Sequence, residues 1–350
     1  MKTKLILGIE TSCDDTSIAI LRGIPEEPTK HPTLLSHHSF SQEIILKRWG
    51  GVVPEIASRN HVLKITPLLD ECFKETNLKP QDIDLIAITT HPGLLGPLLT
   101  GITAAKTLSL LHQTPIRPVN HLYAHLEAIH LTDQVTYPYL GLLVSGGHSI
   151  YFLVSSPTEF KIIGTSIDDA AGEAFDKGGK LMGLGYPAGK IIDEMAISGD
   201  HTKYTFPVSM LDSGDANLSF SGVKTALRNF LEKAENENCN LNDVCASYQH
   251  AIVTALLKKC KKALSITGIK DIPIVIGGGV ACNSYLRKTF IKEFNKTNTV
   301  HFVAPQFCTD NGAMIANYAL RTFEDAVSFP ECLGIDARGN FLQKTKGTNQ

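Results

Sequence analysis

A pattern of strand, polar turn and strand occurs twice in this chain. The first copy is LILGIE, TSCDDT and SIAILRG over residues 5–23, and the second is GLLVSGGHSIYFLVSS over residues 141–156. Apolar runs rich in β-branched residues and separated by a short polar segment predict paired strands. Each copy continues into further predicted strands and helices, with strands at 34–40, 84–90 and 116–120 after the first copy and at 160–168, 273–279 and 301–305 after the second. The repetition predicts a duplicated α/β fold.

The composition is that of a globular protein, and the net charge is not that of a protein that binds nucleic acid strongly on its own. Hydrophobic residues make up 43% of the 350 residues and charged residues 19%, as in an ordinary globular protein. The net charge of −2 gives the whole chain no strong attraction for nucleic acid, and the densest basic run, KKCKK at 258–262, is typical of a solvated helix face. The eight cysteines form no CxxC pair, which favours reduced thiols in the cytoplasm.

No segment resembles a targeting signal or a membrane span. The apolar run at residues 5–9 ends at Glu10, which is too short for a signal peptide. The most apolar stretch, Leu94–Leu111, contains Pro97 and Lys106 and favours a buried helix. We therefore expect a cytoplasmic protein.

The histidines of HLYAH, at positions 121 and 125, have the spacing of a metal-binding pair. Residues four apart lie on one face of a helix, so both rings can reach one ion, whereas His130 faces away. The chain has thirteen histidines, and chance alone can also produce this spacing. Zinc peptidases place a general-base glutamate after the first histidine, where this chain has Leu122, so the peptidase interpretation is not supported.

Three turns have residues suited to a nucleotide, although each has a simpler interpretation. SGGH at 145–148 can form an anion-binding nest or a plain hairpin turn. GGGVACN at 277–283 leads from a strand into a helix start, which favours phosphate. The two aspartates of TSCDDT can hold a magnesium–phosphate group, orient a proton transfer, or lie solvated in a turn.

Eight motifs together resemble the tRNA adenosine threonylcarbamoyltransferase (TsaD/Gcp) family. In chain order, they are GIETSCDDT, GGVVPEIASRNH, HLYAH, LLVSGGHS, SIDDAAGEAFDK, SFSGVKT, GGGVACN and CTDNGAM. The resemblance implies a duplicated actin-like (ribonuclease-H-like) fold with two lobes and the active site between them. The expected lobes are residues 1–135, completed by a C-terminal helix at 310–326, and residues 136–309. The implied reaction moves a threonylcarbamoyl group from threonylcarbamoyl-AMP to N6 of the adenosine beside the anticodon of tRNA.

The resemblance also assigns residues. It implies one divalent metal ion held by His121, His125 and Asp310. Its adenylate-binding positions fall on Leu143, Val144, Ser145, Gly146, Gly147, Asp176, Gly189, Asp193 and Asn283. We expect Asp14 or Asp15 to orient the incoming amine or to accept its proton. The chain departs from the family pattern at Asp15, where glutamate is common, at Ala188, where glycine is usual, and at Cys282, where a small residue is usual.

Two imidazoles and one carboxylate leave coordination positions open, as in catalytic metal sites. This ligand set suits ferrous iron or zinc, and we favour ferrous iron. The resemblance implies tRNA as a partner, together with a paralogous actin-like subunit and a small ATPase subunit. Two alternatives stay open: a small-molecule kinase of the actin-like superfamily, which the phosphate-binding turns favour, and a non-catalytic nucleotide-binding scaffold.

Overall fold

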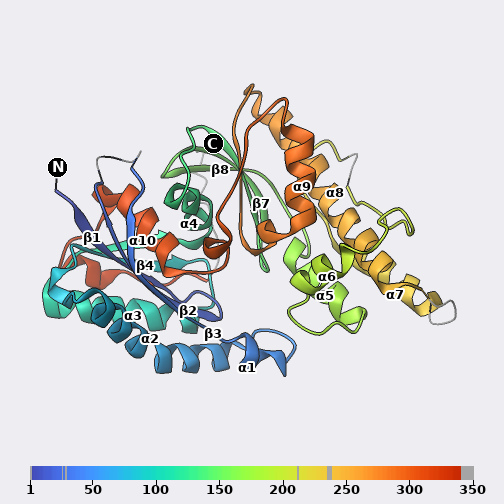
Figure 1. Ribbon diagram of the computed structural model, residues 1–350. Coiled ribbons are helices and arrows are strands. Elements are labelled where there is room, and N and C mark those ends of the chain that lie inside the picture. Colours follow the sequence, from blue (N-terminus) through green and yellow to red (C-terminus); the bar gives the residue numbers. More distant parts are fainter. Residues whose placement is uncertain (1, 26, 28–29, 211–212, 235–238, 340–350) are drawn as a thin grey trace, which may run out of the picture. The chain divides into compact units, whose positions relative to one another are not determined.

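The computed structural model describes residues 2–339, except 26, 28–29, 211–212 and 235–238 (Figure 1). The chain forms two compact units, one of residues 1–124 and 310–350 and the other of residues 125–309. The division falls inside helix α4 (His121–Glu127), which therefore contributes residues to both units. Each unit contains one five-stranded sheet.

The sheet of the first unit has the strand order β3-β2-β1-β4-β5. Strands β1, β2 and β3 form an antiparallel meander, and β4 and β5 continue the sheet in parallel from β1. The turn between β1 and β2 is residues 11–14, and β2 begins at Asp15, two residues before the strand expected from the sequence. The bounds are β1 (Lys4–Glu10), β2 (Asp15–Gly23), β3 (Thr33–Ser41), β4 (Leu85–His91) and β5 (Ile116–Asn120).

The sheet of the second unit repeats this order and these directions. It runs β10-β9-β6-β7-β8, with β6 pairing antiparallel to β7 and parallel to β9. The strands are β6 (Tyr139–Val144), β7 (Ser149–Ser156), β8 (Glu159–Thr165), β9 (Ile274–Gly277) and β10 (Val300–Phe302). Replacing β1 to β5 by β6 to β10 converts one sheet into the other, so the predicted duplicated α/β fold is confirmed.

Side-chain alternation along β1 explains how helices cover both faces of the first sheet. Leu7 and Ile9 join one apolar cluster with residues of α2 (Pro54–Thr76) and α3 (Leu95–His112). Gly8 points the other way, towards α10 (Gly312–Arg321), which lies along the opposite face (Figure 1). Successive strand residues thus face different helices, and both faces of β1 are buried.

Gly8 allows α10 to approach the sheet closely. A β-carbon on Gly8 would lie 2.1 Å from the Gly312 carbonyl oxygen and 2.8 Å from the Ala316 β-carbon. We expect Gly8→Ala to lower the free energy of unfolding by about 1–3 kcal/mol, because the backbone of α10 must move to make room. Urea denaturation measures this loss. Gly279→Ala is the control, since a β-carbon there meets no atom within 4 Å, and an equal loss in both variants would contradict the packing argument.

The helices of the second unit are dominated by the long α8. They are α5 (Ala171–Leu181), α6 (Gly189–Ala196), α7 (Ser221–Ala234), α8 (Leu241–Thr267) and α9 (Ser284–Phe294). Two buried tyrosines fix α8 and its neighbours, because Tyr151 donates to the Leu256 carbonyl at 2.5 Å and Tyr248 donates to the Ala174 carbonyl at 2.8 Å. Short 3-10 turns complete the chain at Pro80–Asp82, Ala128–Leu131, Gly279–Cys282, Pro305–Phe307, Phe323–Asp325 and Glu331–Gly334.

The basic run on α8 differs from the expected solvated face. Lys259 is buried, and its ammonium donates to Ser213 Oγ at 2.6 Å and to the Asp215 carbonyl at 2.9 Å. Lys261 forms an ion pair with Glu293. The expectation was wrong for Lys259, because its long aliphatic stem is buried while its ammonium group reaches acceptors in the more exposed segment of Ser213 and Asp215.

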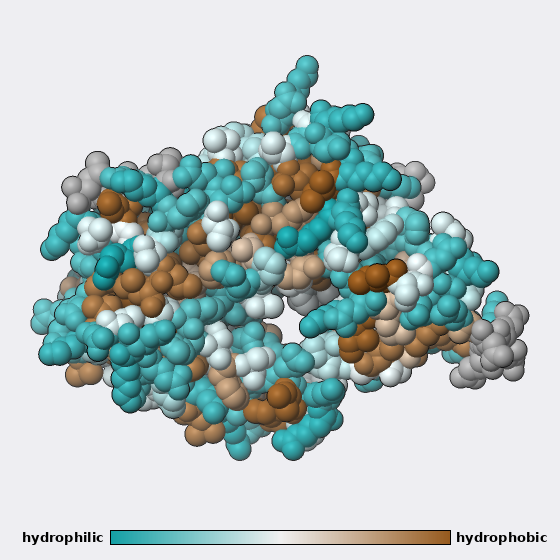
Figure 2. All heavy atoms as spheres, in the orientation of Figure 1, coloured by the Kyte–Doolittle hydropathy of each residue, from teal (hydrophilic) through white to brown (hydrophobic). Residues whose placement is uncertain are grey.

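Apolar side chains gather on the surface of the first unit. Ile44 on α1 (Glu43–Lys47), Trp49, and Val62 and Leu63 on α2 are all more than half exposed. Brown hydrophobic groups appear at the bottom of Figure 2, where Figure 1 places α1 and α2. Helix α3 is also less buried than its composition predicts, since Leu110 and Leu111 are exposed. Within the described part of the chain, no helix combines the length and apolarity of a membrane span.

Candidate functional site

Helix α4 positions the two histidines of HLYAH. Asn120 begins the helix, because its side-chain oxygen accepts from the backbone N–H of Leu122 at 2.9 Å. His121 and His125 follow one turn apart, and both are buried. His130 lies in a different environment, where its ring is 3.3 Å from the Tyr137 hydroxyl. The expectation that His130 faces away from the pair is therefore confirmed.

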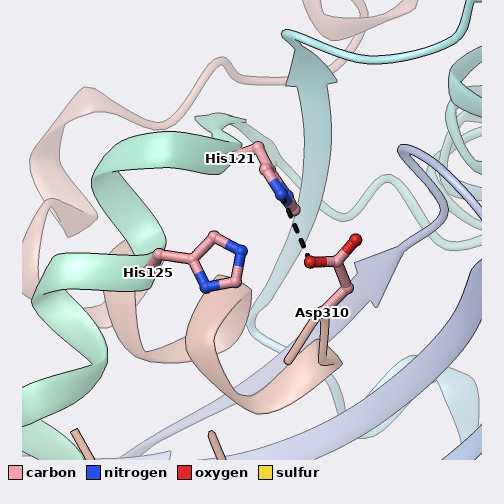
Figure 3. Close-up of side chains that lie close together, drawn as sticks. All are labelled: His121, His125 and Asp310. Carbon is pink, nitrogen blue, oxygen red and sulfur yellow. Dashed lines mark ion pairs between the residues drawn. The ribbon is translucent and has the colours of Figure 1, made fainter. Parts of the chain in front are cut away.

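Asp310 joins the histidine pair from a distant part of the sequence. It directly precedes the N-cap of α10, where the Asn311 side chain accepts from the backbone N–H of Met314 at 2.8 Å. Asp310 Oδ1 lies 3.4 Å from His121 Nε2. One ligand atom of each of His121, His125 and Asp310 lies within 4.8 Å of the others (Figure 3). Two imidazoles and one carboxylate at this separation can hold a metal ion.

Glu10, at the end of β1, orients the His121 ring through its Nδ1 atom, on the side away from Asp310. Its Oε2 lies 3.0 Å from His121 Nδ1, and the same oxygen accepts from Thr89 Oγ at 2.5 Å. Its Oε1 accepts from the backbone N–H of Ser12 at 2.5 Å. A fully ionised carboxylate can only accept, so this network places a proton on Nδ1 and directs Nε2 of His121 towards Asp310. This carboxylate–histidine arrangement is common behind metal ligands.

The electrostatics around His121 favour a cation. Burial opposes the charged ring, but Asp310 and Glu10 raise the pKa of His121 well above its ordinary value. Burial would also raise the pKa of Glu10, and the charge and hydrogen bond of His121 hold it below its ordinary value instead. Without a metal ion, a proton on His121 therefore supplies the positive charge between two carboxylates. A divalent ion can take over this role.

Asp14 lies in the turn between β1 and β2, and Asp15 is the first residue of β2, in the same unit as Asp310. Burial and the charges of Asp310 and Asp14 raise the pKa of Asp15 to about 8. Burial and the charge of Asp310 also raise the pKa of Asp14. Within the described residues, Asp15 Oδ1 is a buried oxygen with no hydrogen-bond partner. Buried carboxylates with such raised pKa values are typical of functional sites.

The donor set and its surroundings fit a divalent ion. The three ligand side chains are buried or half-buried, and Glu10 completes the outer layer around His121. The nearby carboxylates of Asp14 and Asp15 gain from a positive charge, because repulsion by Asp310 contributes, after burial, to the raised pKa of each. Among the residues that the structure describes, this is the one histidine, cysteine and carboxylate cluster with metal-binding geometry.

The second unit contains a cavity of about 370 Å³, within the usual size range of small-molecule sites. Its lining combines apolar side chains, two carboxylates and several glycines: Gly146, Gly172, Phe175, Asp176, Pro187, Gly189, Lys190, Asp193, Gly279, Val280, Cys282, Asn283 and Thr309. Five of the residues implied by the family resemblance lie in this wall, namely Gly146, Asp176, Gly189, Asp193 and Asn283.

Three helices begin at this cavity. Gly172 lies in the first turn of α5, Gly189 is the first residue of α6, and Asn283 caps α9 by accepting from the Leu286 N–H at 2.8 Å. Helix N-termini present unpaired N–H groups and partial positive charge, so they attract anions. The apolar walls formed by Phe175 and Val280 complement this polar end. The combination can hold a ligand with an anionic group and a flat apolar ring.

Comparison with known proteins decides the family. The family model described as tRNA N6-adenosine threonylcarbamoyltransferase (TsaD) matches residues 33–317 of this chain. A protein of this name from Thermosipho africanus (strain TCF52B) is 43% identical over 326 residues, covering 93% of this chain and 96% of the relative. Another, from Anaeromyxobacter sp. (strain Fw109-5), is 44% identical, covering 89% and 92%. This chain belongs to the tRNA N6-adenosine threonylcarbamoyltransferase family.

Solved structures outside this family share its fold. The chain superposes on component A of the Acidaminococcus fermentans (R)-2-hydroxyglutaryl-CoA dehydratase with a TM-score of 0.55 at 13% identity, covering 91% of this chain and 98% of that one. Full-length HypF gives a TM-score of 0.58 at 13% identity, covering 92% of this chain and 46% of that one. The predicted duplicated actin-like fold is confirmed by these likenesses.

The other residues that the family resemblance implies lie near the cavity without lining it. Leu143 and Val144 are buried strand residues of β6, so their side chains belong to the core. Ser145 closes the SGGH turn, because its hydroxyl accepts from the His148 N–H at 3.1 Å. Gly147 lies in the same turn. The contribution of this segment to a ligand site would come from its backbone.

The carboxylates of the cavity wall also support local structure. Asp176 accepts from the Ala188 N–H at 2.8 Å, next to the start of α6. Asp193 accepts from the N–H and hydroxyl of Ser284 at 2.8 and 3.0 Å. Sequence reasoning missed the structural roles of both residues, as well as Glu10, which it used only as the end of an apolar run. A carboxylate inside an apolar strand was the available signal for Glu10.

Proposed function

We propose that this chain transfers a threonylcarbamoyl group to N6 of the adenosine beside the anticodon of tRNA. Family membership over most of the chain carries the proposal. The proposed donor is threonylcarbamoyl-AMP, whose phosphate and adenine suit the helix starts and apolar walls of the second unit's cavity. A mixed anhydride is already activated, so the enzyme has to position the reactants and stabilise charge.

In this proposal, Asp176 and Asp193 accept hydrogen bonds from the donor's ribose hydroxyls. Both carboxylates lie in the cavity wall. The backbone N–H groups of the SGGH turn and of the starts of α5, α6 and α9 hold the phosphate. Phe175 and Val280 cover the adenine and keep water from it.

We propose that His121, His125 and Asp310 hold one divalent ion, with ferrous iron favoured over zinc because ferrous iron often binds two histidines and one carboxylate. When bound, the ion supplies Lewis-acid stabilisation of the negative charge that develops as AMP leaves. Glu10 keeps Nε2 of His121 available as a ligand by holding the proton on Nδ1.

Asp14 and Asp15 are proposed to orient the adenosine amine and to receive its proton. The N6 lone pair is delocalised into the ring, so the amine needs a nearby acceptor as the new bond forms. We expect Asp15→Asn to lower the rate of tRNA modification about 100-fold, within the usual range for a general base. A single-turnover assay with preformed donor measures the effect. The assignment is wrong if Asp14→Asn and Asp15→Asn both keep the wild-type rate.

A second measurement shows whether Asp15 is retained at a cost in stability. The folded, metal-free protein holds a proton on Asp15 up to about pH 8, whereas the unfolded chain releases it near the ordinary value of 3.8. The unfolded state therefore binds fewer protons in this range, and the Asp15 contribution to stability falls as pH rises from about 4 to about 8. Denaturation of metal-free Asp15→Asn is expected to show a weaker decline than wild type.

We propose that protein partners contribute to tRNA binding. The net charge of the chain is −2. On α8, Lys259 is buried and Lys261 is paired with Glu293, so this helix offers few free cations to the phosphates of tRNA. The exposed apolar side chains of α1 and α2 suit a protein interface. We propose that a paralogous actin-like subunit binds this apolar surface of α1 and α2, and that a small ATPase subunit is the second partner. A steep salt dependence of tRNA binding by the isolated chain contradicts this division of labour.

The function is tested by supplying threonylcarbamoyl-AMP, tRNA, ferrous iron and the partner subunits, then measuring threonylcarbamoyladenosine in digested tRNA by mass spectrometry. The expected product requires this chain and an unmodified adenosine beside the anticodon. Phosphoryl transfer from ATP to small molecules without any modified tRNA would favour the kinase alternative. Donor binding without either product would favour the non-catalytic scaffold.

A further inference from the structure

A second, smaller cavity adjoins the first one in the same unit. It lies where α6 and α9 pack against α8, and Asp193 belongs to the walls of both cavities (Figure 1). Its volume of about 190 Å³ is about half that of the first cavity. Drug-sized and nucleotide-sized ligands occupy about 300–1,000 Å³, so the second cavity suits a smaller metabolite.

Gln249 offers this second cavity a buried hydrogen-bond donor. Its side chain lines the cavity, although the residue is only 2% exposed. Its Oε1 accepts from Asn283 Nδ2 at 2.6 Å, which fixes the amide and leaves Nε2 as the donor end. Among the residues that the structure describes, no group accepts from this Nε2. Buried donors almost always have an acceptor, so Nε2 points to a ligand with a carbonyl or carboxylate oxygen.

Two opposite charges lie one helical turn apart in the wall of the second cavity. Asp193 accepts from the N–H of Ser284 at 2.8 Å and from its hydroxyl at 3.0 Å, so the carboxylate lies at the first turn of α9. Lys288 follows Ser284 by four residues, which places it on the same face of the helix, about 6 Å further along. No described carboxylate forms an ion pair with Lys288. Each oxygen of Asp193 keeps an acceptor position, because a carboxylate has about four in total.

The remaining wall is largely apolar and is held in place by ring contacts. The Tyr285 hydroxyl lies 2.7 Å from His250 Nδ1, and the rings of His201 and His250 pack with their centroids 4.8 Å apart. Ile197 and Ala246 add aliphatic surface, and Ile197 is 74% exposed. A ligand with an aliphatic group would cover this exposed apolar surface.

We propose that the second cavity binds a small α-amino acid as a zwitterion. The ammonium group of the amino acid donates to Asp193, and its carboxylate accepts from Lys288 and from Gln249 Nε2. Its side chain covers Ile197. A simple carboxylate would leave Asp193 unused and a simple amine would leave Lys288 unused, so a ligand with both charges matches both ends of the cavity. L-Threonine is the first probe, because it is small and the proposed donor carries the same amino acid.

Binding in the second cavity has a consequence for the first cavity, and this part rests on the proposed function. Asp193 is proposed to accept from the ribose of the donor, so an ammonium group in the second cavity competes for the same carboxylate. Coupling between two sites is reciprocal. We expect saturating L-threonine to lower the affinity for AMP at least about fivefold, the lower end of typical coupling. Donor binding would then respond to the free amino acid.

Isothermal titration calorimetry of the full-length protein with L-threonine tests the site. Saturable binding of one molecule per chain is expected, with a dissociation constant of about 1 mM or below. Isobutyrate lacks the ammonium group and isopropylamine lacks the carboxylate. Each is expected to bind at least about tenfold more weakly, because each loses a hydrogen-bonded charge. The proposal is overturned if L-threonine shows no saturable binding at millimolar concentrations, or if either of these half-ligands binds equally well.

Removing one charge shows whether the amino acid binds in this cavity. Lys288→Met keeps the aliphatic stem, and it is expected to bind L-threonine at least about tenfold more weakly. Lys288 is exposed, so its replacement should leave the fold intact, which circular dichroism checks. Lys292→Met is the matched control, since Lys292 is an exposed residue one turn further along α9 and outside the lining of both cavities. Equal affinity of wild type and Lys288→Met for L-threonine would place the amino acid elsewhere and overturn the assignment.

Titration with AMP in the presence and absence of L-threonine separates the amino-acid site from its consequence. A fall in AMP affinity that disappears in Lys288→Met supports both. If L-threonine binds and the affinity for AMP is unchanged, the coupling through Asp193 is wrong and the amino-acid site stands. If the protein binds L-threonine but not AMP, the nucleotide role of the first cavity is wrong and the amino-acid site again stands.

Discussion

Replacing His121 with alanine is expected to remove both the bound metal and the activity. His121 Nε2 is the ligand atom next to Asp310, and the ring is held from behind by Glu10. Substitution of a group that is hydrogen-bonded to a metal ligand commonly lowers metal affinity about 10- to 100-fold. Loss of the ligand itself should therefore lower metal affinity by more than about 100-fold. Elemental analysis of protein purified with ferrous iron, beside the tRNA modification assay, measures both effects.

The control for this variant is a histidine of the same unit outside the site. His38 on β3 pairs with Glu75 at 2.8 Å, and His38→Ala is expected to keep the ion and the activity. Asp310→Asn should also lose metal, because an amide oxygen is a weaker ligand than a carboxylate. Retention of one ion per chain by His121→Ala would contradict the metal assignment. Loss of activity with the ion still bound would instead point to a different role for the ring.

The fold was predictable because its signal is local and repeated. The apolar β-branched runs on both sides of TSCDDT and SGGH indicate paired strands without any knowledge of the rest of the chain. Repetition then predicts that the two sheets share one order of strands, and the structure has the same order twice. Helix α3 shows the limit of this reasoning, because its apolar composition predicts burial while Leu110 and Leu111 are exposed. Composition reports how apolar a helix is, and only the fold decides which sides are covered.

The metal site was only partly predictable from the residues. Spacing along one helix pairs His121 with His125, because four residues make about one turn. Nothing in that spacing indicates Asp310, which reaches His121 only because α10 returns to the first sheet near the end of the chain. Without the family motif CTDNGAM, the pair would have stayed a coincidence of two histidines. Long-range contacts of this kind depend on topology, which residue spacing does not contain.

Sequence reasoning missed Glu10 because its contacts appear only in three dimensions. Replacing Glu10 with glutamine is expected to weaken metal binding. Ser12 N–H, Thr89 hydroxyl and the His121 ring all donate to its two oxygens. The amide in Glu10→Gln has one acceptor oxygen, so either of its orientations turns an NH₂ group towards a donor. The His121 ring then loses its fixed tautomer and direction. We expect metal affinity to fall about 10- to 100-fold, as for other carboxylates behind metal-binding histidines.

Two measurements separate this orienting role of Glu10 from a general loss of stability. Metal titration gives the dissociation constant, and NMR of metal-free protein gives the titration of His121, whose pKa should fall when the Glu10 charge is removed. Thr89→Val is the matched control, because it removes one donor from the same carboxylate oxygen and leaves the contact between Glu10 and His121 in place. If both variants bind metal equally, Glu10 acts only on packing. If Glu10→Gln alone binds metal weakly, and its His121 titrates at lower pH, then Glu10 is the residue that holds His121 in position for the metal ion.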